Sequence, residues 1–193
     1  MKKVITISRE FGAGAGEIGK AVAAQLGYEY YDKNIIFKAA DEYGIDLESI
    51  SKWDEKKAVN FGFAQSLFDF YNRPLDEKIF EAQTAVIKKI AEKGSCVIVG
   101  RNANAILKHF DSTLHVFFCA DTDFRLKRML EQYPDVTEKK MLEQIANIDK
   151  KRKKYCTYYT NTDFGAAKNY DICLNTSKLG LEKCKDIILS MAK

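Results

Sequence analysis

The sequence has no run of apolar residues long enough to span a membrane, and no apolar leader with a cleavage site precedes its first strand-like segment. It also has no C-x-x-C pair. Its five cysteines are an odd number at wide spacing, which argues against a disulfide framework and against a zinc site. From these absences we expect a cytoplasmic protein with no membrane partner.

Excess charge of one sign is small. The 31 Lys and Arg residues stand against 27 Asp and Glu residues, a net charge of +4. That value does not indicate a nucleic-acid polymer as a partner, but it permits small polyanions such as nucleotides. No internal repeat or low-complexity linker divides the chain. With 46% hydrophobic residues over 193 positions, we expect a single domain over residues 1–193 with its own core.

A glycine-spaced turn follows the first apolar run. Residues 4–7 have the pattern of a strand, residues 8–17 read S-R-E-F-G-A-G-A-G-E, and a helical pattern begins after them. Glycines let a backbone turn tightly and approach a ligand, and free N–H groups at a helix start attract anions. The stretch therefore predicts a phosphate-binding loop. An ordinary strand-to-helix turn rich in small residues is the alternative.

This loop departs from the P-loop pattern G-x-x-x-x-G-K-[ST]. If Gly14 is the second glycine of that pattern, Ala15 holds the lysine position and Gly16 the hydroxyl position. Arg9 then holds the position of the leading glycine. Both side chains that grip phosphate and magnesium in the usual motif are therefore missing.

Beyond the loop, strand-like and helix-like segments alternate. Periodicity and end signals predict strands over 4–7, 28–32, 96–99, 114–119 and 170–176, and helices over 17–26, 33–43, 75–93, 103–110, 123–132, 137–155 and 180–191. The strands over 96–99 and 114–119 are continuously apolar, which is typical of parallel strands covered on both faces. We predict an α/β fold with a parallel sheet between two layers of helices.

Ligands of such sheets bind at the carboxyl ends of the strands. We therefore expect the loops at 9–16 and 100–102, together with Asp32 and Asp121, to meet at one rim. The aromatic-rich stretch 46–74 fits neither a strand alternation nor one long helix stripe. We interpret it as a small helical insertion beside the cleft, with most of its aromatics in its own core.

Several of these segments together resemble the cytidylate kinase-like family, a branch of the P-loop nucleoside monophosphate kinases. The resemblance rests on the loop from Ser8 to Ile18, on L-G-Y-x-x-x-D at 26–32, on V-I-V-G-R at 97–101, on D-x-x-R at 149–152 and on Y-D-I-C-L-N-T-S at 170–177. It covers nearly the whole chain in order. It implies a three-layer P-loop NTPase-type fold with an insertion at about 46–74 on the nucleoside monophosphate side and a helical lid at about 124–165.

The resemblance also implies an activity. A family member would move the γ-phosphoryl group of ATP, with Mg²⁺, to a nucleoside monophosphate, with CMP or dCMP as the leading acceptor. It would act as a monomer or a homodimer. Two alternatives stay open, namely a nucleotide-binding or regulatory module without catalysis, and a kinase for another small acceptor.

Residue roles follow from the same resemblance. Asp32 and Arg101 match positions beside the acceptor nucleotide, and Asp149 would orient Arg152 or another lid cation. The catalytic set implied is Arg9, Arg125, Arg128, Asp149 and Arg152, and the set that holds the ATP phosphates is Ser8, Gly12, Ala13, Gly14, Ala15, Gly16 and Glu17. From spacing alone, Arg125 and Arg128 could equally be the solvated face of a surface helix.

The chain differs from ordinary cytidylate kinase at two places. Ala15 stands where the loop lysine is expected, and Gly100 stands where a carboxylate precedes the arginine matched by Arg101. Arg9 or a lid arginine would then supply the missing positive charge. The magnesium ligands stay open among Glu10, Glu17, Asp32 and Asp121.

Overall fold

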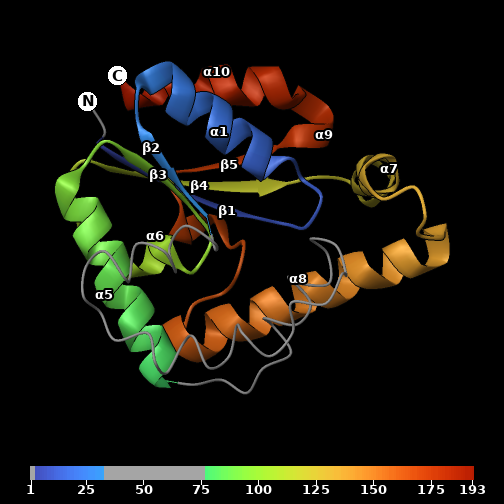
Figure 1. Ribbon diagram of the computed structural model, residues 1–193, viewed down its shortest axis with the longest axis horizontal. Coiled ribbons are helices and arrows are strands. Elements are labelled where there is room, and N and C mark those ends of the chain that lie inside the picture. Colours follow the sequence, from blue (N-terminus) through green and yellow to red (C-terminus); the bar gives the residue numbers. More distant parts are fainter. Residues whose placement is uncertain (1–2, 33–76) are drawn as a thin grey trace.

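The computed structural model describes residues 3–32 and 77–193. For Lys78 and Ile79 it describes the backbone alone. The helix expected over 33–43 and the insertion expected over 46–74 lie outside the described residues. The remaining chain forms a central sheet with helices on both sides (Figure 1). Within the described ranges, no helix is both long and apolar enough to cross a membrane.

All five predicted strands form and pair in parallel. They are β1 (Val4–Arg9), β2 (Glu29–Tyr31), β3 (Cys96–Val99), β4 (Thr113–Cys119) and β5 (Ile172–Asn175), in the order β2-β3-β1-β4-β5. In the register, Ile5 faces Val97 on one side and Leu114 on the other. Strands β2 and β3 lie on one side of β1, and β4 and β5 lie on the other. Open parallel sheets bind ligands at the carboxyl ends of the strands where the strand order reverses, and the loop after β1 lies at that place.

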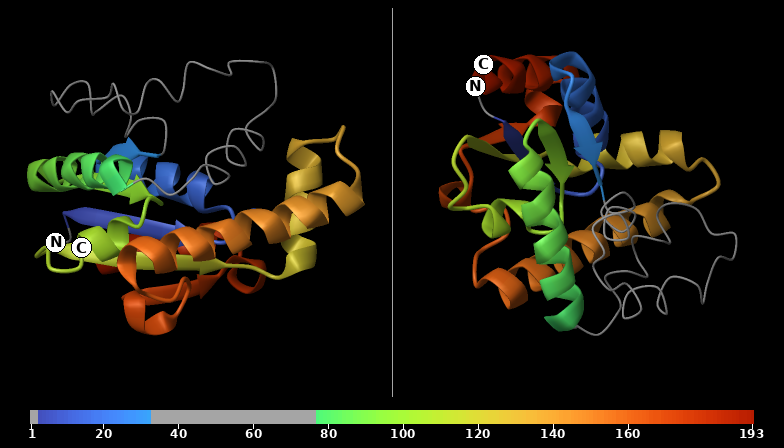
Figure 2. Two further views of the ribbon diagram at one scale, coloured as in Figure 1. Left: turned by 90° about the horizontal axis from the view of Figure 1, so that it is seen from below. Right: turned by 60° about the vertical axis from the view of Figure 1, so that its left-hand side comes forward.

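The helices form the two outer layers. Helices α1 (Ala15–Leu26), α9 (Thr176–Leu179) and α10 (Leu181–Ala192) cover one face, and α5 (Glu77–Lys93) and α6 (Ala103–Ile106) cover the other (Figure 1). Helix α7 (Thr122–Gln132) lies beyond the carboxyl ends of the strands. Helix α8 (Glu138–Thr160) runs back from it on the α5 side (Figure 2). The predicted three-layer α/β fold is confirmed.

Some element ends differ from those predicted. Helix α1 begins at Ala15 rather than Glu17 because Gly14, in a left-handed conformation, already serves as its N-cap. Strand β5 covers Ile172–Asn175 and not 170–176, because Tyr170 caps the 3-10 turn at 167–169 and Thr176 already begins α9. The short helix α9 was not predicted, and the Asn175 side chain caps it by accepting from the Ser177 and Lys178 N–H groups.

Apolar side chains form three clusters. One lies between the sheet and α1 with α10, and a second lies between the sheet and α5 with α6. The third packs Phe11, from the loop after β1, against Met129 of α7 and Met141, Ile145 and Ile148 of α8. This third cluster fixes the position of α7 and α8 relative to the glycine-rich loop.

Candidate functional site

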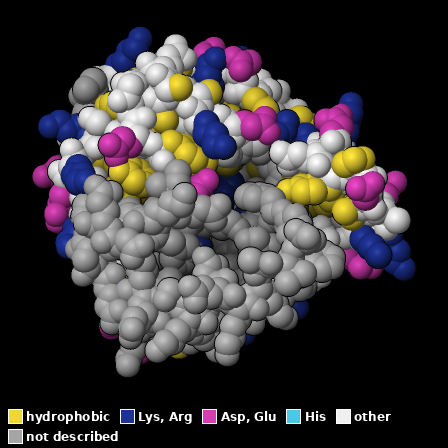
Figure 3. All heavy atoms as spheres, in the orientation of Figure 1, with side chains coloured by type: hydrophobic (Ala, Val, Ile, Leu, Met, Phe, Trp, Pro, Cys, Tyr) yellow, Lys and Arg dark blue, Asp and Glu magenta, His cyan; other side chains and the backbone are white. Residues whose placement is uncertain are grey.

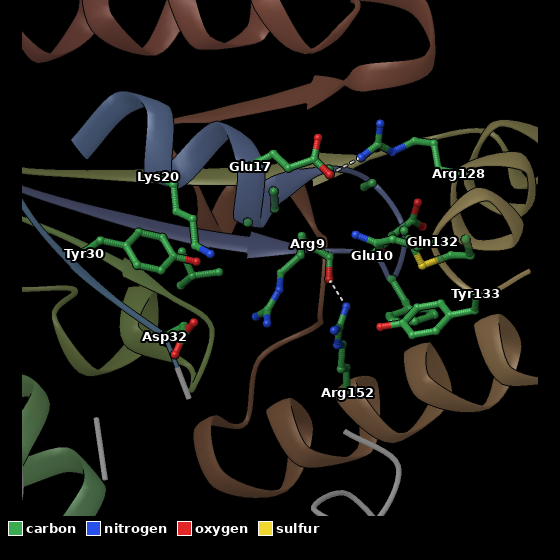
Figure 4. Close-up of a pocket in the computed structure, with 18 residues that line it drawn as sticks. Arg9, Glu10, Glu17, Lys20, Tyr30, Asp32, Arg128, Gln132, Tyr133 and Arg152 are labelled. Atoms are coloured by element: carbon green, nitrogen blue, oxygen red, sulfur yellow. Dashed lines mark hydrogen bonds and ion pairs between the residues drawn. The ribbon is translucent and has the colours of Figure 1, made fainter. Parts of the chain in front are cut away.

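A cavity of about 410 Å³ lies at the carboxyl end of β1. The loop from Arg9 to Glu17 forms one wall, Tyr30, Asp32 and Val99 from the neighbouring strand ends form another, and α7 and α8 close the third side. Figure 4 shows cationic side chains from β1, α1, α7 and α8 around it. On the face seen in Figure 3, by contrast, cationic and acidic side chains of the described residues are interspersed.

Two glycines give the loop its shape. Gly12 and Gly14 have φ values of 83° and 82°, the left-handed region that favours glycine. A Cβ on Gly14 would lie 2.5 Å from Leu181 Cδ2, and one on Gly12 would lie 3.0 Å from Arg125 Cβ. Backbone conformation and close packing therefore both require glycine, and the loop brings the N-terminus of α1 to the cavity wall.

The loop is also held from the β5 side. The fully buried Thr176 hydroxyl lies 3.0 Å from the Ala13 carbonyl oxygen and 3.3 Å from the Cys119 carbonyl oxygen. Thr176 was not among the residues predicted from the sequence to form the site. Its one signal was its place in the Y-D-I-C-L-N-T-S segment at 170–177, because a lone threonine after a strand predicts no contact with a loop 163 residues away.

A buried network behind the loop links it to α7 and α8. One Asp149 carboxylate oxygen accepts from the Phe11 N–H at 2.8 Å, and the other lies 2.5 Å from Arg125 Nη1. Arg125 also donates to the Phe11 carbonyl at 3.3 Å, and Arg152 Nη1 lies 3.8 Å from Asp149. Arg125 is 8% exposed and does not line the cavity. Its guanidinium thus contacts the loop on the side away from the cavity.

Arg9 and Arg152 meet on the cavity side. Arg152 donates to the Arg9 carbonyl at 2.9 Å and lines the cavity. The Arg9 guanidinium lies over Gly100, at the end of β3, where an added Cβ would be only 2.1 Å from Arg9 Nη1. The carboxylate expected before Arg101 in an ordinary cytidylate kinase is therefore replaced by a bare glycine that Arg9 covers.

Arg128, from α7, lies above the loop. Its guanidinium pairs with Glu17 at 2.6 Å and lies 3.6 Å from the Cβ position of Gly14. Arg128 therefore faces the cavity, whereas Arg125, three residues earlier on the same helix, faces the buried network.

Lys20 and Tyr30 also line the cavity, and neither was singled out from the sequence. Burial and the nearby Asp32 carboxylate raise the pKa of Tyr30 to about 12, while the Arg9 charge acts in the opposite direction. Tyr30 therefore keeps its proton at neutral pH. Lys20 follows Gly16 by one helical turn, and this spacing could have predicted that the Lys20 side chain lies on the same face of the helix as the loop.

Other expected site residues lie apart from the cavity. The Ser8 hydroxyl hydrogen-bonds to Asn104 Oδ1 at 3.2 Å, and Asp121 pairs with Lys178 at 2.8 Å. Hydrogen bonds from Lys178 hold the pKa of the Asp121 carboxyl below its usual value. Arg101 is 5% exposed and has a left-handed backbone conformation directly after Gly100.

The acidic side chains at the cavity come from three places. Glu10, Glu17 and Asp32 line it. Glu10 accepts from the Ala120 N–H at 3.0 Å, and Glu17 pairs with Arg128. Among the described residues, no group of three or more His, Cys, Asp or Glu side chains could hold a metal ion by itself.

Known proteins share both the sequence pattern and the fold. The model of the cytidylate kinase-like family matches residues 4–178. A cytidylate kinase from Sulfolobus acidocaldarius is 24% identical over 188 residues, covering 97% of this chain and 92% of the relative. An uncharacterized protein from Eubacterium ventriosum has a crystal structure that is 27% identical, with a TM-score of 0.75 over 98% of this chain and 97% of that one.

A more distant structure defines the fold class. A gluconokinase from Sinorhizobium meliloti superposes with a TM-score of 0.58 at 12% identity, covering 99% of this chain and 91% of that one. The likeness shows that the two chains share one α/β fold. Because the family model spans residues 4–178, most of the chain, the chain belongs to the cytidylate kinase-like family.

Proposed function

We propose that the protein transfers the γ-phosphoryl group of ATP to a nucleoside monophosphate, with CMP or dCMP as the preferred acceptor. The family and the kinase fold make it a nucleotide or small-molecule phosphotransferase. The observation that best supports the proposal is the convergence of Arg9, Arg128 and Arg152, from three separate elements, on a cavity walled by a glycine-rich loop.

The loop and the arginines have complementary tasks in this proposal. Backbone N–H groups of the loop and of the first turn of α1 would bind phosphate oxygens, with Gly12 to Glu17 as the ATP side. Arg9, Arg128 and Arg152 would offset the negative charge on the transferring group. An arginine in such a position can be worth about 10³ to 10⁵ in rate.

The acceptor side would lie toward β2 and β3. Asp32 lines the cavity there. Arg101, which is buried directly after β3 and does not line the cavity, would have to turn toward it to bind the acceptor phosphate in the bidentate manner that guanidinium groups favour. An oxygen of the acceptor phosphate forms the new bond to the γ-phosphorus as the bond from that phosphorus to the bridging oxygen breaks. ADP leaves with the electron pair, and the acceptor needs no strong base because its phosphate is already ionised near neutral pH.

Arg125 and Asp149 would act through the loop rather than on the substrate. Their contacts with the Phe11 peptide fix the backbone whose N–H groups face the cavity. We therefore assign both positioning roles. For Arg125 this replaces the direct role that the family resemblance implied, and for Asp149 it adds the loop to the lid cation that the resemblance expected it to orient.

The donor set fits a magnesium ion carried by ATP. Mg²⁺ usually keeps several waters and uses one or two carboxylates plus substrate phosphates, so a cage of protein ligands is not required. Glu10, Glu17 and Asp32 are the cavity carboxylates that would hold it, directly or through water. When bound, the ion would supply positive charge that offsets the negative charge of the phosphates.

The test is ADP formation from MgATP with a panel of acceptors that includes CMP, dCMP, UMP, AMP, GMP and gluconate. We expect turnover with CMP or dCMP at a rate at least tenfold above the other acceptors. In the variant Arg128→Gln we expect kcat to fall about 100-fold or more, because the positive charge that Arg128 would direct at the transferring group is lost. Lys139→Gln, on an exposed part of α8, is the control and should keep its activity.

Other outcomes would identify the alternatives. ATP binding without turnover on any acceptor would favour a non-catalytic nucleotide-binding module. Turnover confined to a non-nucleotide acceptor would favour a kinase for another small molecule.

A further inference from the structure

The loop leaves open space at the position where the usual motif has a hydroxyl. Gly16 lines the cavity in the first turn of α1, and a Cβ added there would meet only the Tyr30 hydroxyl, at 3.8 Å. With Ala15 beside it buried to 3% exposure, neither residue presents a polar side chain to a phosphate. A cationic side chain from a neighbouring turn can therefore approach without a steric conflict at position 16.

Lys20 occupies that neighbouring turn. It follows Gly16 by four residues, so both lie on one face of α1, and side chains on a helix lean toward its N-terminus. A lysine stem of four methylene groups spans about one helical turn, roughly 5.4 Å. The ammonium can thus reach the level of Gly16.

The structure places the Lys20 ammonium at the cavity. Lys20 lines it, and its Nζ lies 5.7 Å from the centre of the Tyr30 ring. In Figure 4 the side chain leaves α1 on the cavity side and runs toward Tyr30, with Arg9 nearby. The ring gives the lysine stem an apolar surface and a weak attraction to its charge.

Neighbouring cations are engaged by other groups. Arg128 pairs with Glu17, and Arg152 donates to the Arg9 carbonyl. For Lys20, by contrast, no carboxylate among the described residues lies within ion-pair distance. Its charge is therefore available to a phosphate without breaking an existing ion pair.

We propose that Lys20 supplies the ammonium group that the loop lacks at position 15, reaching the β- and γ-phosphates of ATP across the gap left by Gly16. This inference rests on the proposed function and adds to it a lysine from the second turn of α1. Gly16 then has a defined role, since a bulky side chain there would block the path.

The first experiment compares ATP and AMP binding, by calorimetry, in the wild type and in Lys20→Met. We expect ATP binding to weaken roughly 10- to 100-fold, as for the loss of a charge-assisted bond, and AMP binding to change less than 3-fold because AMP lacks the β- and γ-phosphates. Lys183→Met, an exposed lysine on α10, is the control and should bind both like the wild type.

The second experiment moves the ammonium. In Gly16→Lys/Lys20→Met the charge returns one turn earlier, and we expect at least a tenfold recovery of ATP affinity. A merely structural lysine would show no such recovery.

Two results would overturn the proposal. If the Lys20→Met variant binds ATP within 3-fold of the wild type, the role proposed for Lys20 is wrong, and the proposed function of the protein is unaffected. A wild-type protein that binds no ATP would remove the proposed function as well, and this failure is distinguishable because it is seen without any substitution.

Discussion

At the scale of single residues, an absent side chain decides where a charge lies. Gly100 has a φ of 89°, and the Arg9 guanidinium occupies the space that its Cβ would fill. From the sequence, Gly100 was only the loss of a carboxylate. In the structure, the missing side chain of Gly100 leaves the room that the Arg9 guanidinium needs beside the cavity.

We expect Gly100→Ala to lower kcat/KM about 10- to 100-fold, because the new methyl group displaces Arg9. The positive φ should also cost about 1–2 kcal/mol of unfolding free energy. Steady-state kinetics and urea denaturation measure the two effects.

Gly27→Ala is the matched control for that substitution. Gly27 has a φ of 67°, but a Cβ there would meet nothing within 4 Å. It should lose a similar amount of stability and keep its activity. Equal activity in the two variants would contradict the role assigned to Gly100.

At the scale of elements, α7 and α8 determine the backbone of the loop between β1 and α1. Asp149 of α8 and Arg125 of α7 contact both sides of the Phe11 peptide, and Phe11 itself packs between the two helices. Movement of these helices would therefore be transmitted to the loop between β1 and α1. The lid region predicted at about 124–165 contains both.

We expect Asp149→Asn to destabilise the fold by about 2–4 kcal/mol. The amide oxygen can still accept from Phe11, but the buried Arg125 guanidinium loses its nearer counter-charge and keeps only Glu10, at 3.9 Å from its Nε. ATP affinity should fall with the change in loop geometry. Denaturation curves and ATP titrations measure these effects.

Asp163→Asn removes a carboxylate from an exposed pair with Lys168, at 3.9 Å, and serves as the control. Its stability should stay within about 0.5 kcal/mol of the wild type. If Asp149→Asn behaved in the same way, the buried network would not be what holds the loop.

At the scale of the whole molecule, two groups whose pKa values are raised by burial make the free energy of unfolding depend on pH in the alkaline range. Burial and the nearby Glu29 raise the pKa of Cys96 to about 12 from an ordinary value of 9.0, and the pKa of Tyr30 is also raised to about 12. Both groups stay protonated in the folded chain at pH values where the unfolded chain releases its protons. Their contribution to stability is therefore complete below pH 9 and is lost as the pH rises toward 12.

Between pH 8 and pH 10.5 we expect unfolding free energy to fall, with about 2 kcal/mol of the fall due to Cys96. Tyr30 should contribute a smaller share because water screens its partly exposed hydroxyl. Cys96→Ala should reduce the pH-dependent change, measured by urea denaturation at both pH values, and the exposed Cys173→Ala should alter it less. An equal slope in wild type and Cys96→Ala would contradict this assignment.

Some features of this protein were determined by the sequence alone. Apolar runs such as 96–99 and 114–119 predicted buried parallel strands, and the spaced glycines at 12 and 14 predicted the loop, because these signals come from residues close together in the chain. The carboxyl-end rule then placed Arg9, Asp32 and the loop at one cavity.

Only the tertiary structure decided which of the candidate charges face that cavity. Arg125 pairs with Asp149 in a buried network, and the Ser8 hydroxyl donates to Asn104. Lys20 and Tyr30, which were not predicted as site residues, line the cavity. Periodicity tells which residues share a face of one helix, but not what that face meets. That depends on how elements distant in sequence pack, and in this protein α7 and α8 pack against the loop through Phe11.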